Sequence, residues 1–332
     1  MPSMSQNHRP PHAPFTHAVA ISAVLLSGCT QIAGESFEGY SLRPDVVPEA
    51  AGAADAGMSG AAGAAASTDG AVGAVAAEER RLVSGGIERR FLLVHPEPMP
   101  TDARLPLILS FHGERETLEN SAETIREALP LEREAAGAAV FVYPRAPNSA
   151  PGWPFFNDAG RRIETEFIRA VIGAVEEELG IDPMRVFLAG WDGGAAMANA
   201  LACRLGTNVL RGVAAHSGAL YEVPREDGMG DDFEIDRPTD VTSCPLPDAL
   251  VIWGTSDQSD GTTYAGDGLK TYKWYGGTLG CQPSQEPWSS VPECVSNSAC
   301  LRSVVWCPIE GLGHSLWPGA AAAIWQFFDG LR

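Results

Sequence analysis

The sequence feature that most constrains the fold is an apolar strand that runs through a glycine-flanked turn into a helix of small residues. Residues 186–189 read Val-Phe-Leu-Ala and lead directly into Gly190-Trp191-Asp192-Gly193-Gly194. A helix of short side chains is expected next, over residues 195–203. The glycines allow strand and helix to approach closely. Such a strand–turn–helix unit lifts the side chain at its apex, here Asp192, above the edge of a sheet.

Apolar runs alternate with helical patterns along the rest of the chain. Continuous apolar runs of this kind indicate strands that are buried on both faces, and their alternation with helices predicts an α/β domain. We therefore expect a mostly parallel central sheet with helices on both faces. The strands are predicted at residues 89–95, 105–111, 139–143, 186–189, 212–215, 249–253 and 303–309, and the other helices at 118–129, 163–179 and 320–328.

Four polar residues follow shortly after predicted strands: His112, Asp192, Asp257 and His314. Loops that leave the carboxyl ends of parallel strands build the ligand site in sheets of this type. The four side chains are therefore expected to converge on one edge of the sheet. A histidine and carboxylates in such a group are residue types used for general base and nucleophilic catalysis.

The first eighty residues are expected to lie outside the folded domain. The apolar run 18–26 is too short to span a bilayer, and it ends in Leu26-Ser27-Gly28-Cys29, which is similar to the lipobox of a bacterial lipoprotein signal. An ordinary secretory signal with a chance cysteine is the alternative. Residues 50–77 are mostly Ala and Gly and cannot bury enough surface to offset their ordering entropy. The prediction is a signal peptide at 1–28, a flexible tether lipid-anchored through Cys29 at 29–80, and one domain at 81–332.

The net charge of the chain argues against nucleic acid as a ligand. The formal net charge is −19, and Lys270 and Lys273 are the only lysines, so no basic stripe exists for nucleic acid. The acidic stretch 226–240 lacks the spacing of an EF-hand; we interpret it as a surface insertion, with calcium binding left open. No metal spacing, phosphate loop or dinucleotide fingerprint is found in the sequence, so no cofactor is expected.

Cysteine content agrees with export. Of the seven cysteines, Cys29 needs no partner if it carries a lipid. Six cysteines in an exported domain suggest up to three disulfides, whose connectivity their spacing leaves open. They are Cys203, Cys244, Cys281, Cys294, Cys300 and Cys307.

From Arg89 onward the chain resembles the poly(3-hydroxybutyrate) depolymerase, feruloyl esterase and acetylxylan esterase group of α/β-hydrolases. The segments that carry the resemblance are LILSFHG (107–113), IDPMRV (181–186), GTSD (254–257) and GLGHSLWPG (311–319). The resemblance implies an α/β-hydrolase fold without a large cap. It also implies that His314 is the general base and Asp257 its orienting acid, with Asp192 at the nucleophile position.

Further roles are carried over from the same resemblance. The N–H groups of Gly193 and Glu114 would donate to an oxyanion, next to His112 on the same loop. The family often bridges the positions of Cys203 and Cys244. Apart from the resemblance, Trp153 and Trp317 are candidates for stacking against a substrate, because both are on predicted loops near the expected site.

The sequence departs from the family at the nucleophile, because Asp192 stands in place of serine. One interpretation is an Asp-nucleophile hydrolase for halides or epoxides, since a carboxylate is already ionised at neutral pH. A second is a degenerate esterase, now a surface-displayed binding protein, in which Asp192 forms a static ion pair with His314. A third is an active esterase that uses another serine, such as Ser217, Ser256 or Ser315.

Taken together, the sequence predicts an exported lipoprotein at the outer membrane or surface of a bacterial cell. Its domain would take a small-molecule or polymer ester, such as a polyester or a feruloyl or acetyl sugar ester, with catalysis weakened at Asp192. It is expected to be a monomer that meets the membrane only through lipidated Cys29.

Overall fold

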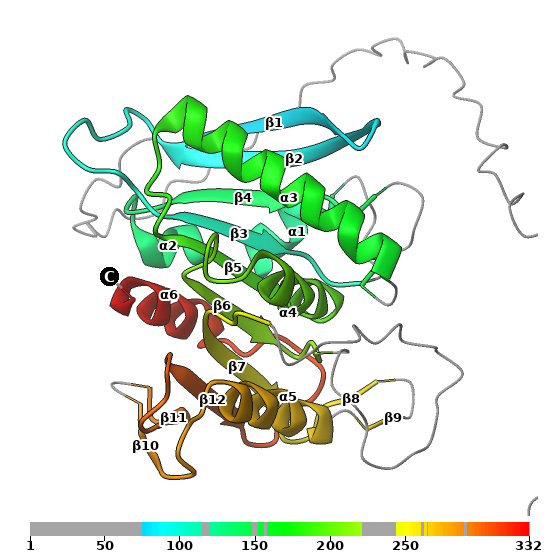
Figure 1. Cartoon of the computed structure of the whole chain (residues 1–332), viewed down its shortest axis with the longest axis vertical. Helices are drawn as coiled ribbons and strands as arrows, with labels where there is room; N and C mark the ends of the chain where they lie inside the picture. The colour runs from blue at the N-terminus through cyan, green and yellow to red at the C-terminus, as the bar shows by residue number, and fades with distance from the viewer. Residues whose placement is uncertain are drawn as a thin grey trace, which may run out of the picture. The chain divides into compact units, whose positions relative to one another are not determined.

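The centre of the domain is a ten-stranded sheet with the order β1-β2-β4-β3-β5-β6-β7-β12-β11-β10, seen in a computed structural model (Figure 1). The six strands from β4 to β12 are mutually parallel, and β2, β11 and the outer strands pair antiparallel at the two sides. The sheet contains β1 (Val75–Ser84), β2 (Ile87–Pro96), β3 (Leu107–Phe111), β4 (Val140–Pro144), β5 (Val186–Trp191), β6 (Gly212–His216), β7 (Asp248–Gly254), β10 (Gln285–Pro287), β11 (Val295–Asn297) and β12 (Val304–Ile309).

The structure describes residues 75–331 except 115–119, 148–151, 156–157, 221–243, 260–261, 264 and 289–290. The predicted signal peptide, Cys29, most of the predicted tether and the acidic stretch 226–240 therefore lie outside the described residues. Among the described residues, no helix is long and apolar enough to cross a membrane.

Helices cover both faces of the sheet, as predicted. One face carries α3 (Asp158–Leu179), α4 (Gly193–Leu205) and α5 (Ala265–Thr278), and the other carries α1 (Ser121–Ala128), α2 (Leu131–Ala135) and α6 (Ala320–Gly330) (Figure 1). A short hairpin of β8 (Gln258–Ser259) and β9 (Thr262–Thr263) stands apart from the sheet. Each face has its own buried apolar cluster. This arrangement confirms the predicted α/β-hydrolase architecture.

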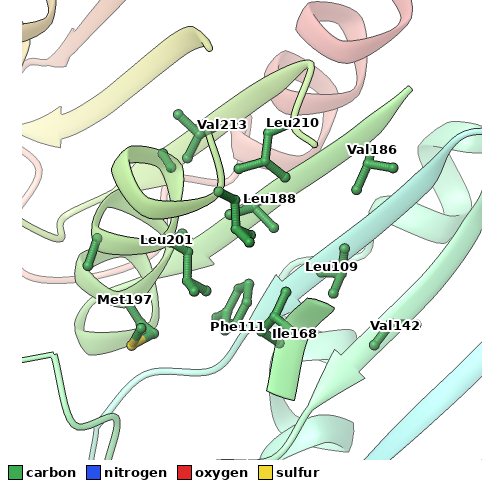
Figure 2. Close-up of a cluster of buried hydrophobic side chains, with 14 of the residues drawn as sticks. Leu109, Phe111, Val142, Ile168, Val186, Leu188, Met197, Leu201, Leu210 and Val213 are labelled. Carbon is green, nitrogen blue, oxygen red and sulfur yellow. The ribbon is translucent and has the colours of Figure 1, made fainter. Parts of the chain in front are cut away.

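Small residues bring α4 close to the sheet. Figure 2 shows Met197 and Leu201 of α4 facing Leu188 of β5 and Phe111 of β3. The alanines between these larger side chains are also buried, so the helix backbone can lie near β5 and β6. Since α4 begins at the turn that holds Asp192, this packing fixes the direction from which that side chain enters the site.

The predicted domain boundary at residue 81 was too late. β1 begins at Val75, and it pairs with β2 along its full length, from Val75 opposite Pro96 to Ser84 opposite Ile87. The sequence around Ala76 and Ala77 and the charged residues after them resembles a tether, because an outer strand buries little apolar surface. The strand predicted to be first, at 89–95, is therefore the second.

Candidate active site

Asp192 lies at a tight and strained elbow between β5 and α4. Its backbone has φ 55° and ψ −126°, outside the regions that non-glycine residues favour. A Cβ on Gly194 would lie 2.2 Å from the carbonyl oxygen of His112, and one on Gly190 would lie 2.6 Å from the backbone of Gly194. The glycines are therefore required by close backbone approach. The elbow geometry expected for a nucleophile is present although the residue is aspartate.

Three side chains from separate loops form a continuous hydrogen-bonded chain. The Nδ1 atom of His314 lies 2.9 Å from Oδ1 of Asp257, and its Nε2 atom lies 3.2 Å from Oδ1 of Asp192. Asp257 is fully buried, whereas the side chains of His314 and Asp192 are 22% and 26% exposed. Each follows the carboxyl end of a parallel strand: β5, β7 or β12. The structure thus brings the predicted catalytic residues together.

The second oxygen of Asp192 accepts from a backbone N–H that is predicted to hold an ester oxyanion. The backbone N–H of Glu114 donates to Oδ2 of Asp192 at 2.9 Å. The N–H of Gly193 also donates to this carboxylate. These are the two groups predicted to form the oxyanion hole. One side chain therefore engages both the predicted base, through Oδ1, and a predicted oxyanion donor, through Oδ2.

This arrangement holds His314 in its charged form. Hydrogen bonds to Asp192 and then to Asp257 raise the pKa of His314 to about 10, although burial opposes them. Burial raises the pKa of Asp192, but hydrogen bonds from His314, Glu114 and Gly193 outweigh it and lower that pKa below its ordinary value. At neutral pH an imidazolium lies between two carboxylates. An imidazolium has no free lone pair, so His314 cannot act as a base in this state.

His112 supports the predicted oxyanion loop, residues 112–114, from beneath. It is 1% exposed, its Nε2 accepts from the backbone N–H of Ala146 at 3.1 Å, and its Nδ1 lies 2.8 Å from the carbonyl oxygen of Gly113. The first contact leaves the proton on Nδ1, which donates to Gly113. Burial lowers the pKa of His112 to about 4, so it is neutral. Its role here is to set the path of the loop that presents Glu114.

The stacking role predicted for Trp153 does not fit its position. Its side chain is 2% exposed, and its Nε1–H donates to the carbonyl oxygen of His112 at 2.9 Å. The indole also packs on the rings of Phe111 and His112. Trp153 therefore braces the oxyanion loop, and it offers no face to a ligand. The sequence placed it correctly near the site but could not reveal its burial.

Trp317 is half-buried beside the His314 loop. Its backbone N–H donates to Nε2 of buried His216 at 2.9 Å, which ties this loop to the end of β6. Sequence reasoning missed another aromatic neighbour: the ring of Trp191 lies 5.6 Å from that of His314, centroid to centroid. The position of Trp191 directly before Asp192 in the sequence could have indicated this contact with His314.

Ser217, one of the alternative serines, is poorly placed for nucleophilic attack. Nε2 of His216 accepts a hydrogen bond from the backbone N–H of Trp317, so the proton of the His216 ring is on Nδ1. Nδ1 of His216 then donates to the Ser217 hydroxyl, 3.0 Å away. His216 therefore cannot take a proton from Ser217 through that contact, and burial lowers its pKa to about 4. Ser256 and Ser315 are exposed loop residues.

The six cysteines of the domain form three disulfides. Cys203 pairs with Cys244, as the family resemblance implied, and joins the end of α4 to the segment before β7. The pairings that the sequence left open are Cys281–Cys300 and Cys294–Cys307. Among the residues that the structure describes, no group of three His, Cys, Asp or Glu side chains is arranged to hold a metal ion.

Comparison with protein families gives a match to the model "Esterase PHB depolymerase" over residues 91–261, just over half of the chain. Feruloyl esterase C of Emericella nidulans is 26% identical over 254 residues, which cover 72% of this chain and 83% of the esterase. A probable feruloyl esterase C of Aspergillus terreus is 32% identical over 134 residues, covering 40% of this chain and 47% of the relative. The chain therefore spans about half of that relative's length in the match.

Solved structures show the same fold. The acetyl xylan esterase of Aspergillus awamori superposes with a TM-score of 0.57 at 15% identity, covering 76% of this chain and 99% of that one. A putative dienelactone hydrolase of Klebsiella pneumoniae has a TM-score of 0.51 at 15% identity, with 78% and 98% covered.

Proposed function

The chain belongs to the esterase PHB depolymerase family, and from this premise we propose that its domain binds carboxylic esters while Asp192 suppresses their hydrolysis. The observation that carries the proposal is the double engagement of the Asp192 carboxylate. Oδ2 accepts a hydrogen bond from the N–H of Glu114, and Oδ1 contacts Nε2 of His314. The ester ligand would be a polyester, as the description of the family suggests, or a feruloyl or acetyl sugar ester, as the names of similar proteins suggest.

Three physical effects oppose hydrolysis of an ester here. Attack by a carboxylate on an ester carbonyl would form an anhydride, which is uphill. The negative charge of Asp192 stands beside the position where oxyanion charge would develop, and this opposes the stabilisation that dominates such catalysis. His314 is already protonated and cannot take a proton from water. Loss of a serine nucleophile costs about a millionfold in rate in a well-studied serine protease.

The setting of this function follows the sequence predictions. The protein is exported, attached through lipidated Cys29 to the bacterial envelope, with residues 29–74 as part of the spacer before β1, and it acts as a monomer. The three disulfides support the export alone, because such bonds persist in oxidising compartments outside the cytosol.

Binding and turnover can be measured on the same sample. Methyl ferulate and an acetylated xylo-oligosaccharide are titrated calorimetrically into the protein, and each mixture is then analysed by mass spectrometry after long incubation. We expect binding at about 1 mM or tighter, with the ester recovered intact. Release of ferulate or acetate that is abolished in His314→Ala would overturn the proposal, as would absence of binding to both esters.

A second candidate is a hydrolase in which Asp192 attacks an alkyl carbon, and one contact favours it. With Oδ2 held by Glu114, Oδ1 is the oxygen that can attack. The new C–O bond would form as a halide leaves or an epoxide opens, giving an alkyl ester on Asp192. Because esterified Asp192 is neutral, the pKa of His314 would fall, and its proton would pass to solvent or to the alkoxide of an opened epoxide. Neutral His314 could then take a proton from water as the water oxygen attacks the Asp192 carbonyl carbon. The alcohol would leave with that proton, and the Asp192 carboxylate would form again.

Heavy-oxygen labelling separates the two candidates. After turnover of 1-bromobutane or an epoxide in water labelled with oxygen-18, an Asp nucleophile retains one labelled oxygen in the peptide that contains Asp192. The ester-binding proposal predicts no label in this peptide. Asp192→Asn serves as the control, because its amide cannot follow the same cycle.

A further inference from the structure

The indole of Trp191 packs against two loops of the Asp192 site. A Cβ built on Gly113 would lie 2.8 Å from Cε3 and 2.9 Å from Cζ3 of this indole, so the ring lies directly on the backbone of the predicted oxyanion loop. The centroid of the Trp191 side-chain ring lies 5.6 Å from the centroid of the His314 ring. One aromatic side chain therefore contacts both the oxyanion loop and the predicted base.

The scaffold fixes the position of this indole. Trp191 is the last residue of β5, whose other residues are buried, and its backbone pairs with His216 of β6. The side chain is half-buried against the apolar cluster on the α6 face of the sheet. Its Nε1 atom is buried and makes no hydrogen bond with any residue that the structure describes. An unpaired buried N–H costs free energy, so apolar packing alone does not explain an indole at this position.

The imidazole beside this ring carries a positive charge. Oδ1 of Asp257 lies 2.9 Å from Nδ1 of His314, and Oδ1 of Asp192 lies 3.2 Å from its Nε2. These contacts raise the pKa of His314 to about 10. His216 also acts on this group from the end of β6, but burial lowers the pKa of His216 to about 4, so it is neutral. The planes of the Trp191 and His314 rings are 31° apart, closer to stacked than to edge-on.

This geometry suits an attraction between a cation and an aromatic face. The face of an indole carries partial negative charge, and it attracts a cation that lies within about 6 Å of the ring centroid. The attraction acts on the imidazolium form of His314 and hardly at all on neutral imidazole. An aliphatic side chain at residue 191 would also keep water from His314, but it would not supply this attraction.

We propose that Trp191 is a positioning residue, which holds His314 as an imidazolium through the face of its indole ring. This inference rests on the proposed function and deepens it, because it adds to Asp192 a second restraint that keeps the predicted base protonated. Replacing Asp192 with serine alone would leave this second restraint in place. Protonation of His314 would then still limit ester hydrolysis by Asp192→Ser near neutral pH.

The pKa of His314 can be measured by NMR of the full chain labelled with nitrogen-15 histidine, between pH 7 and 11. Trp191→Leu keeps an apolar side chain and removes the ring face. The matched control is Trp325→Leu, since Trp325 is a half-buried tryptophan on the same apolar cluster but lies near Phe187 at the start of β5. We expect the pKa of His314 to fall by about half a unit or more in Trp191→Leu and by less than about 0.2 in Trp325→Leu.

Two milder changes keep the proposal testable if Trp191→Leu does not fold. Trp191→Phe should give a smaller fall in the pKa of His314, because a phenyl face attracts cations less strongly than an indole face. Growth on 5-fluorotryptophan keeps the shape of the indole and weakens the negative charge of its face, so it should also lower this pKa. An unchanged pKa in all of these proteins overturns the proposal. A rise in Trp191→Leu also overturns it, because a rise is expected if the indole only buries His314.

The pH dependence of catalysis gives a second readout. In the Asp192→Ser background, the acid limb of kcat/KM for p-nitrophenyl butyrate reports the pKa of His314. Adding Trp191→Leu should move this limb to lower pH, whereas a purely structural role would lower the rate equally at every pH and would overturn the proposal.

The two proposals can fail separately. If Asp192→Asn lowers the pKa of His314 and Trp191→Leu does not, the inference about Trp191 is wrong and the proposed function stands. If His314 is neutral at pH 8 in the wild-type protein, the proposed function is wrong, whatever Trp191→Leu does.

Discussion

The ion pair between Asp192 and His314 should make the stability of the domain depend on pH in a defined direction. The substitution that isolates it is Asp192→Asn, which keeps the shape of the side chain. The asparagine carbonyl can accept from the N–H of Glu114, and its amide can donate to a neutral imidazole at His314. The variant should therefore lower the pKa of His314 and leave the elbow in place.

The sign and size of the effect follow from the pKa of His314. It is about 10 in the folded protein, against about 6.5 in an unfolded chain. A raised histidine pKa contributes stability that is fully present below pH 6.5 and is lost as the pH rises through about 10. The difference corresponds to at most about 5 kcal/mol. Because both side chains are about a quarter exposed, and Asp257 supplies part of the effect, we expect about 1–2 kcal/mol from Asp192.

Urea unfolding at several pH values between 6 and 10.5 measures this directly. The wild-type protein should be more stable than Asp192→Asn by about 1–2 kcal/mol near pH 6, and the two curves should converge near pH 10. The control is Glu166→Gln, which replaces an exposed carboxylate on α3 with an amide. Its free energy of unfolding should change with pH in parallel with that of the wild type. Parallel curves for Asp192→Asn would refute the assignment of a charged His314.

Three further outcomes test the scaffold by urea unfolding. Gly194→Ala should lower the free energy of unfolding by about 1–3 kcal/mol or more, because its Cβ would lie 2.2 Å from a backbone oxygen. Gly173→Ala is the control and should not lower it, because the space around Gly173 is open. Glu164→Gln should cost about 3–5 kcal/mol, since it leaves the buried guanidinium of Arg89 unpaired; Glu177→Gln on the exposed face should cost little. Replacing the cysteines of the Cys203–Cys244 bridge with serine should cost about 2–4 kcal/mol, and no loss would contradict that pairing.

The architecture was predictable because its central parallel strands are buried on both faces. The predicted run 212–215 appears as β6, Gly212–His216, and 249–253 as β7, Asp248–Gly254. The helix α5 was missed because four of its fourteen residues are glycine, which disfavours helix in isolation. One of them is required by packing, since a Cβ on Gly268 would lie 2.3 Å from the Trp253 ring.

The site was predictable in its residues and not in its contacts. Strand ends indicated that Asp192, Asp257 and His314 would converge, because parallel strands share one carboxyl edge. The sequence could not show that one Asp192 oxygen would accept a hydrogen bond from the N–H of Glu114 while the other contacts His314. This arrangement depends on the side-chain rotamer of Asp192. The same limit explains the error at Trp153, whose burial depends on the packing of His112 beneath the loop.

The most direct test of the central claim is p-nitrophenyl butyrate hydrolysis by Asp192→Ser compared with Asp192→Ala. Both changes vacate the oxyanion donors and free His314 from one carboxylate, and only serine supplies a nucleophile. We predict that Asp192→Ser gains at least about a thousandfold over Asp192→Ala, and that adding His314→Ala removes the gain. Wild-type hydrolysis as fast as that of Asp192→Ser, and lost in His314→Ala, would show that Asp192 does not suppress the reaction.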